Sequence, residues 1–150
     1  MKVRFIRSSE KKRIESALKE QFGISKLPYL LLETGKEKIR GFSGHLSKEE
    51  IAVLARIANI EILGLYILRH EHDFRLTLDA TIALKEQISK NILEITDEQL
   101  QLWLRGLDLE IKCGQGTYII KQDSYFIGCG KSNGEKIFNY VPKDRRIKRN

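Results

Sequence analysis

The stretch Phe126-Ile-Gly-Cys-Gly-Lys-Ser-Asn-Gly-Glu-Lys-Ile-Phe-Asn-Tyr-Val-Pro-Lys-Asp-Arg-Arg-Ile-Lys-Arg149 decides the fold of the C-terminal part of this chain. Two apolar runs, Tyr125–Ile127 and Ile137–Val141, flank Ser132-Asn133-Gly134. Because Asn and Gly accept the positive φ angles of a tight turn, the pattern predicts a β-hairpin. Pro142 ends the second strand, since proline has no N–H to donate to a sheet.

Positive charge follows the hairpin and recurs near the N-terminus. Residues 1–50 carry a net charge of +5, residues 51–130 a net −3 and residues 131–150 a net +5, within a total of +7. If the fold brings the two basic ends together, they form one cationic face suited to a polyanion. The alternative is an ordinary solvated surface.

The composition is that of a soluble globular protein, with 41% hydrophobic and 31% charged residues over 150 positions. No apolar run approaches the roughly 20 residues that span a bilayer, and the N-terminus lacks the apolar centre of a secretory signal. We therefore expect a cytoplasmic protein without a membrane partner. In that setting Cys113 and Cys129 are expected to be small buried side chains rather than a disulfide.

Hydrophobic periodicity divides the chain near residue 59. The first part predicts a β-α-β-β-α order: strands at 2–7, 28–33 and 38–42, a helix capped by Ser8 or Ser9 and closed by Gly23, and a helix after the capping box at Ser47. The second part predicts strands at 60–68, 74–78, 91–95, 109–112 and 117–121, short helices at 79–84 and after Thr96, and the final hairpin. We expect an α+β fold: a small α/β domain over residues 1–59 packed on a β-rich domain over residues 60–150.

Two short motifs suggest other chemistry. Gly130-Lys131-Ser132 matches the end of a phosphate-binding loop, but Tyr125 stands where that motif needs its first glycine. In His70-Glu71-His72-Asp73 the two histidines would point to opposite faces of a strand, so a solvated turn is expected instead of a metal site. We expect no catalytic residue, cofactor or metal.

The second part resembles the C-terminal module of the RsmF-type (Nol1/Nop2/Sun) rRNA cytosine-C5 methyltransferases. The resemblance begins at Leu63 and extends over about 85 residues, through the segments 63–66 and 74–84 and then through 116–120, which resembles "GW-LV". Three further segments read "YLRGE-L", "LGWGK" and "LKNHYPKGLR" in that family: here they are Trp103-Leu104-Arg105-Gly106 with Asp108-Leu109, Ile127-Gly128-Cys129-Gly130-Lys131 and 137–146. The first 60 residues loosely resemble the small α/β domains that precede PUA modules. The Pro-Cys nucleophile motif of the family's catalytic domain does not occur in this sequence.

The resemblance implies a PUA-like β-barrel that holds structured RNA, in a free-standing, non-catalytic targeting part. We expect it to act on rRNA or tRNA in RNA modification or ribosome assembly. The expected RNA-binding residues are Lys131, Lys136, Tyr140, Lys143, Arg145, Arg146, Lys148, Arg149, Arg40 and His45. Arg105 and Asp108 are expected to form a structural ion pair. The alternative is a protein-interaction subunit that docks a separate RNA methyltransferase, and an enzyme acting on nucleotides is a third, more remote hypothesis.

Overall fold

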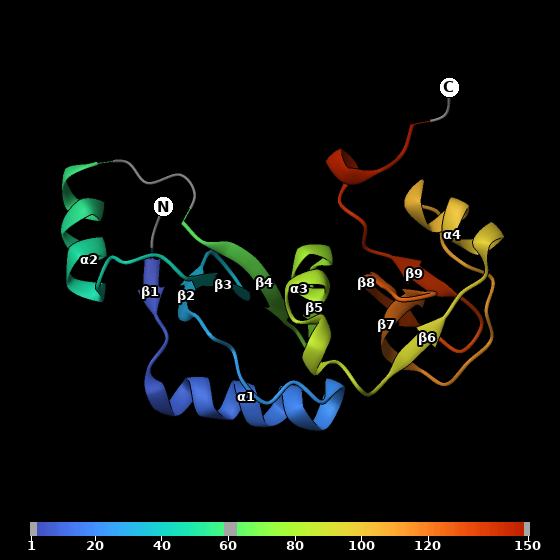
Figure 1. Cartoon of the computed structure of the whole chain (residues 1–150), viewed down its shortest axis with the longest axis horizontal. Coiled ribbons are helices and arrows are strands. Elements are labelled where there is room, and N and C mark those ends of the chain that lie inside the picture. Colours follow the sequence, from blue (N-terminus) through green and yellow to red (C-terminus); the bar gives the residue numbers. More distant parts are fainter. Residues whose placement is uncertain (1–2, 59–62, 149–150) are drawn as a thin grey trace.

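The computed structural model describes residues 3–58 and 63–148, and it contains two β-sheets (Figure 1). The first sheet has the order β1-β2-β3-β4-β5 and is antiparallel throughout. The second has the order β6-β7-β8-β9, in which β6 and β7 run parallel. The fold is therefore α+β, as the sequence predicted.

The strands of the first sheet are β1 (Val3–Phe5), β2 (Leu30–Thr34), β3 (Lys38–Phe42), β4 (Leu65–His70) and β5 (Phe74–Leu76). Helix α1 (Ser8–Phe22) lies along one face of this sheet (Figure 1). The predicted stripe is confirmed, because Ile14, Leu18 and Phe22 are buried in a core shared with the strands. Gly23 ends the helix with a φ of 85°, as predicted. The predicted serine cap is wrong: Arg7 is the N-cap, and no side chain caps the helix there.

Helix α2 (Lys48–Ile57) begins at the capping box predicted for Ser47. Its apolar side is covered only in part, since Ile51 is buried while Val53, Leu54 and Ile57 are exposed. The expected end of this helix at Asn59 lies outside the described residues. The expected strand at 60–68 begins, within the described residues, at Leu65.

The first sheet crosses the boundary expected at residue 59. Strand β3 pairs with β4, so residues on both sides of the boundary share one sheet. The core of that sheet also receives Ile119 and Cys129 from the second sheet. Helix α3 (Leu78–Ala83) lies between the sheets, and its buried Thr81 accepts a hydrogen bond from Gly128 N at 3.1 Å. The two sheets are therefore packed into one body.

The second sheet comprises β6 (Ile92–Glu94), β7 (Gly116–Gln122), β8 (Tyr125–Ser132) and β9 (Ile137–Asn139). Helix α4 (Asp97–Leu104) begins at the predicted capping box of Thr96 and buries Trp103 against the sheet. The indole N–H of Trp103 donates to Ile127 O at 2.8 Å. The two remaining short helices are η1 (Lys85–Gln87) and η2 (Lys143–Arg145). Closure of this sheet into a barrel stays a prediction.

The strand expected at residues 109–112 is wrong, because only Leu109 pairs, through an isolated bridge to Ile137. Ile111 N turns back to donate to Leu109 O at 2.9 Å, so the chain leaves the strand direction there. The predicted β8–β9 hairpin is confirmed, but its turn works differently. Gly134 takes the positive φ of 98°, whereas Asn133 accepts hydrogen bonds from Glu135 N and Lys136 N through its side chain. No helix among the described residues is long and apolar enough to cross a bilayer.

Candidate nucleic-acid interface

The basic segment after Pro142 is held against α3 and α4. Ile147 N donates to Leu104 O at 2.8 Å, which ties the segment to the last turn of α4. Arg145 forms an ion pair with Asp79 of α3 at 2.8 Å. The segment is therefore held on the surface as far as Ile147, at the end of the molecule where Figure 1 shows α4. Arg149, which was expected to bind RNA, lies outside the described residues.

A glycine makes room for one of the tail arginines. Gly106 follows α4 with a φ of 87°, and a Cβ at this position would lie 2.3 Å from Nε of Arg146. The same Nε donates to Val141 O at 3.0 Å. The Arg146 side chain therefore packs across the loop that ends α4, and it joins the tail to that loop.

The ion pair expected between Arg105 and Asp108 is wrong. Asp108 instead accepts from Asn139 N at 2.9 Å and lies 3.3 Å from Nζ of Lys136. Asn139 in turn donates its side-chain amide to Trp103 O at 2.8 Å and Leu107 O at 3.0 Å. Asp108 therefore binds β9 and Lys136 instead of Arg105. The side chain of Arg105 is exposed to solvent.

Carboxylates already pair with three of the cations expected to bind RNA: Lys131, Lys136 and Arg145. For Lys136 and Arg145 the pairs are at the surface, where an ion pair contributes about 0–1 kcal/mol and can be exchanged for a phosphate. Lys131 differs, because its Nζ lies 2.8 Å from Glu71 and 3.9 Å from Asp73. The hydrogen bond from Lys131 lowers the pKa of Glu71, and the same bond raises the pKa of Lys131. Lys131 therefore links the two sheets.

The aromatic side chains of β9 and of the residue after Asn139 already have cationic neighbours. The guanidinium of Arg75 lies 3.8 Å from the centroid of the Tyr140 ring, and Lys136 Nζ lies 4.9 Å from that of Phe138. Tyr140 remains 37% exposed, so part of the ring is accessible. Each of these two rings therefore already has a cation near it, Lys136 from the hairpin turn and Arg75 from β5.

Three exposed cations of the second part of the chain lie just after α4 or in the tail: Arg105, Lys143 and Lys148. Within residues 3–58 and 63–148 none of them forms an ion pair. The backbones of Arg105 and Lys148 are close together, because Arg105 follows Leu104, and Leu104 O accepts from Ile147, the neighbour of Lys148. Lys143 O accepts from Arg146 N in the same tail. Arg105 was assigned a structural role from sequence. The sequence did contain a signal for its true position. Arg105 precedes Gly106, a glycine of the kind that ends a helix, so Arg105 could be expected at the start of the loop after α4.

The two other expected RNA-binding residues lie elsewhere. Arg40 is on β3 and donates to Gly64 O at 3.0 Å, and His45 is in the exposed loop before α2. Both belong to the first sheet and its connections, whereas the tail packs beside α4 at the other end of the molecule (Figure 1). The structure does not bring them together with the tail.

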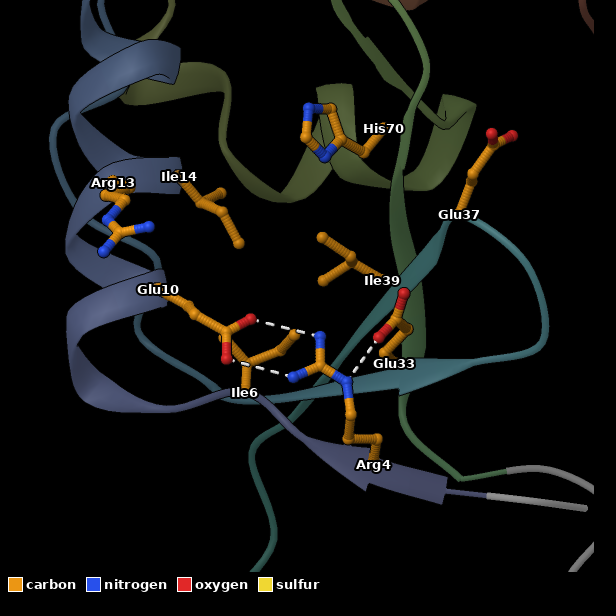
Figure 2. Close-up of a pocket in the computed structure, with 9 residues that line it drawn as sticks. All are labelled: Arg4, Ile6, Glu10, Arg13, Ile14, Glu33, Glu37, Ile39 and His70. Carbon is orange, nitrogen blue, oxygen red and sulfur yellow. Dashed lines mark hydrogen bonds and ion pairs between the residues drawn. The ribbon is translucent and has the colours of Figure 1, made fainter.

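A small pocket of about 250 Å³ opens between α1 and the first sheet (Figure 2). Its floor consists of isoleucines, and its rim carries Arg4 between two carboxylates. Arg4 lies 3.0 Å from Glu10 and 2.6 Å from Glu33, and these hydrogen bonds, first that with Glu10, raise its pKa. A phosphate approaching Arg4 would meet both carboxylates. Arg4 therefore stabilises the packing of α1 on the sheet and is a poor contact for a polyanion.

A larger groove of about 720 Å³ lies between α3, α4 and the β7–β8 turn. Its lining is mostly apolar, and the exposed side chains of Ile82 and Tyr125 lie on it. Lys85 and Glu86 are the charged side chains that line it. The groove offers apolar contact area and a balanced charge, which suits an apolar side chain better than a nucleic-acid backbone.

The motifs that suggested other chemistry have structural roles. Gly130-Lys131-Ser132 lies within β8 and leads into the hairpin turn, and a Cβ on Gly130 would lie 2.4 Å from Ile137. His70 stacks on Phe74, while Glu71 and Asp73 bind Lys131 in the β4–β5 turn. Burial raises the pKa of the Cys129 thiol to about 12, which suppresses the nucleophilic thiolate.

Comparison with known proteins places the second part of the chain. The family model described as the methyltransferase RsmF PUA domain matches residues 90–147. The ribosomal RNA small subunit methyltransferase F of Shewanella oneidensis is 34% identical over 86 residues, which cover 55% of this chain and 18% of that protein. The enzyme of the same name from Vibrio campbellii is 28% identical over 82 residues, which cover 50% of this chain and 17% of that protein. The matched part thus spans under a fifth of the length of these relatives, and residues 90–147 are the part of this chain that is similar to the PUA domain of RsmF.

Proposed function

We propose that this protein binds structured RNA through its PUA domain, by the face formed from the tail after Pro142 and the loop after α4. The observation that carries the proposal is the anchoring of the tail: Ile147 donates to Leu104 O, and Arg146 packs on Gly106. This arrangement gathers unpaired cations on one fixed surface, where little conformational entropy is lost on binding. We call this surface the tail face and define it by Arg105, Lys143, Arg146 and Lys148.

The charge and rigidity of the tail face suit the phosphates of a folded RNA. Each phosphate that a Lys or Arg neutralises releases counterions, so the affinity should fall steeply with salt. The nearby ion pair of Arg145 with Asp79 is at the surface, and a phosphate can replace the carboxylate at small cost. In the proposal the RNA is an rRNA or a tRNA, and its recognition serves RNA modification or ribosome assembly.

The proposed role is binding without bond-making. The region matched to methyltransferase relatives covers only 18% and 17% of their lengths, and it is the part that carries the PUA domain. Its buried Cys129 is held as a thiol, and Cys113 lies 3.4 Å from the hydroxyl of Ser132. These side chains support a packing role. Saturable binding of a methyl donor to the purified protein would contradict the proposal.

The test is fluorescence anisotropy with a fluorescein-labelled rRNA stem–loop and a labelled tRNA transcript, each over a salt series. Replacing Arg105, Lys143 and Lys148 with Ala should weaken binding at least tenfold at about 0.1 M salt and should flatten the salt dependence by about two to three phosphate contacts. A matched control replaces three exposed cations of α1: Lys12, Arg13 and Lys19. Equal losses in the two variants would show non-specific attraction and would refute the tail face.

A second candidate is docking to a separate RNA-modifying enzyme, and the apolar groove between α3 and α4 favours it. The exposed Ile82 and Tyr125 offer contact area that a protein side chain can bury. A purified RNA-modifying enzyme retained after nuclease treatment, and lost with Tyr125→Asp, would support this candidate. Retention that depends on RNA would instead support the tail face.

A further inference from the structure

Helix α1 covers one face of the first sheet. The strand register shows which side chains lie on the opposite face. On the face that contacts α1, Glu33, Ile39 and Leu68 lie in neighbouring strands. The alternate residues of β3 point the other way because side chains alternate along a strand. A register shift between Ile39 and Arg40 pairs Arg40 with Tyr66, which brings Tyr66 to the same face as Arg40 although Leu68 is only two residues away. Those residues include Lys38 and Arg40 of β3, paired with Arg69 and Tyr66 of β4, and Arg75 of β5, paired with Arg69.

Tyr66, near the start of β4, lies beside two cations of this face. The Nζ of Lys38 is 5.8 Å from the centroid of the Tyr66 ring, and the guanidinium carbon of Arg40 is 5.7 Å from it. Arg40 is further fixed by its bond to Gly64 O. Tyr66 is half-buried and Lys38 exposed. An aromatic ring is therefore flanked by two cations, and the hydrogen bond to Gly64 O restricts the position of one of them, Arg40.

The same row of side chains continues into the PUA domain. Arg75 is 15% exposed and stacks on Tyr140, and Glu71 lies 3.0 Å from Nε of Arg69 and 2.8 Å from Nζ of Lys131. The β4–β5 turn thus connects the first sheet with β8. We call this row the sheet stripe, and it consists of Lys38, Arg40, Tyr66, Arg69, Arg75, Lys131 and Tyr140.

The stripe keeps positive charge after its ion pairs are counted. It holds five cations, and among residues 3–58 and 63–148 the carboxylates within 4.0 Å of them are those of Glu37, Glu71 and Asp73, which leaves a net charge of +2 in this part of the chain. Lys38 and Arg40 have no carboxylate among these pairs, so the excess charge lies beside Tyr66. On the face that contacts α1, by contrast, two carboxylates enclose Arg4.

We propose that the sheet stripe binds a second, single-stranded segment of the RNA that the tail face holds, with one base stacked on Tyr66 and phosphates at Lys38 and Arg40. Aromatic platforms flanked by cations bind unpaired nucleotides because every base has a face that can stack. An uncharged protein partner would gain nothing from the excess positive charge. The inference rests on the proposed function, since it extends the same RNA across both sheets.

The test compares two labelled RNAs: a stem–loop, and the same stem–loop with a single-stranded extension of about ten uridines. In the variant with Lys38→Gln and Arg40→Gln, affinity for the extended RNA should fall about three- to tenfold, and the slope of log affinity against log salt should decrease by about 1.4, two single-strand phosphate contacts. Affinity for the bare stem–loop should change less than twofold. The matched control, Lys12→Gln with Lys19→Gln on α1, should leave both affinities unchanged.

Stacking is tested separately with Tyr66→Phe and Tyr66→Leu, whose folding is checked by circular dichroism. Phe should retain binding of the extended RNA, whereas Leu should weaken it about fivefold or more. The inference is overturned if the Lys38 and Arg40 variant binds extended RNA like the wild type while the tail-face variant is weakened. If wild-type protein binds neither RNA, the proposed function fails together with the stripe.

Discussion

The side chain of Arg146 occupies the space beside Gly106 that a Cβ would need, since such an atom would lie 2.3 Å from its Nε and 2.5 Å from its Cδ. Gly106→Ala should therefore displace Arg146 and also strain a backbone with a φ of 87°. We expect a loss of about 1–2 kcal/mol in the free energy of unfolding. Urea unfolding measures this loss, and anisotropy measures the accompanying loss of RNA affinity.

The control for Gly106→Ala is Gly114→Ala. A Cβ at Gly114 would meet only the hydroxyl of Tyr118, at 3.4 Å. This variant should keep wild-type stability within about 0.5 kcal/mol and bind RNA normally. Equal stability and affinity for the two variants would show that Arg146 adapts freely and that the tail does not depend on the loop after α4.

The ion pair of Glu71 with Lys131, which connects the two sheets, should make the stability of the protein depend on pH. Hydrogen bonding from Lys131 lowers the pKa of Glu71 below its ordinary value of 4.5. The ionised carboxylate therefore stabilises the folded state above about pH 4.5, and this contribution is lost as the pH falls through the folded pKa. Glu71→Gln should destabilise the protein by about 1 kcal/mol at pH 7 and by less at pH 3.

Urea unfolding at a series of pH values between 3 and 7 tests this prediction. The exposed Glu98, at the start of α4, provides the control variant Glu98→Gln, which should change the free energy of unfolding by less than Glu71→Gln does at pH 7. If Glu71→Gln has the same effect at pH 3 and pH 7, then the contacts of Glu71 with Lys131 and the two arginines contribute no net stability.

Local signals in the sequence predicted the secondary structure well. The capping boxes at Ser47 and Thr96 join residues three positions apart, so they can be recognised from the sequence without knowledge of the fold. The stripe of Ile14, Leu18 and Phe22 and the αL cap at Gly23 are equally local. The mixed α+β class and the final hairpin followed from such signals.

Contacts between distant residues could not be predicted in the same way. Lys131 and Glu71 are 60 positions apart and Arg145 and Asp79 are 66, so their pairing depends on how the sheets pack. The interpretation of Arg105 with Asp108 failed because closeness in sequence was used where β9 supplies the partners. The sequence did not predict the five-stranded sheet that crosses residue 59, because the pairing of β3 with β4 joins distant residues and cannot be inferred from composition.

The two thiols should react at very different rates. Cys129 is buried with its pKa raised to about 12, so only about one molecule in ten thousand carries the thiolate at pH 8. Cys113 is half-buried. A colorimetric thiol reagent should therefore titrate one thiol quickly in the native protein and two in denaturant. Cys113→Ser should abolish the fast phase, and a fast phase that survives this change would contradict the burial of Cys129.

The side chain of Asn139 should contribute more to the free energy of unfolding than that of Asn133, which is exposed in the hairpin turn. Its side chain donates to Trp103 O and Leu107 O and accepts from Val141 N at 2.8 Å, which ties β9 to the end of α4. Asn139→Ala removes the side-chain partner of Leu107 O and Val141 N in a half-buried site, while Trp103 O keeps its hydrogen bond from Gly106 N. We expect a loss of about 2–3 kcal/mol in the free energy of unfolding. The affinity for RNA should also fall, because the loop beside the tail is no longer attached to β9.

Asn133→Ala is the matched change, because Asn133 accepts two hydrogen bonds, from Glu135 N and Lys136 N, in an exposed turn. Water can replace that side chain, so the loss should stay at about 1 kcal/mol or below. Urea unfolding of both variants decides the matter. Equal destabilisation would mean that burial adds nothing at Asn139, and then the attachment of β9 to α4 would have to come from Asp108 and the packing of Trp103 alone.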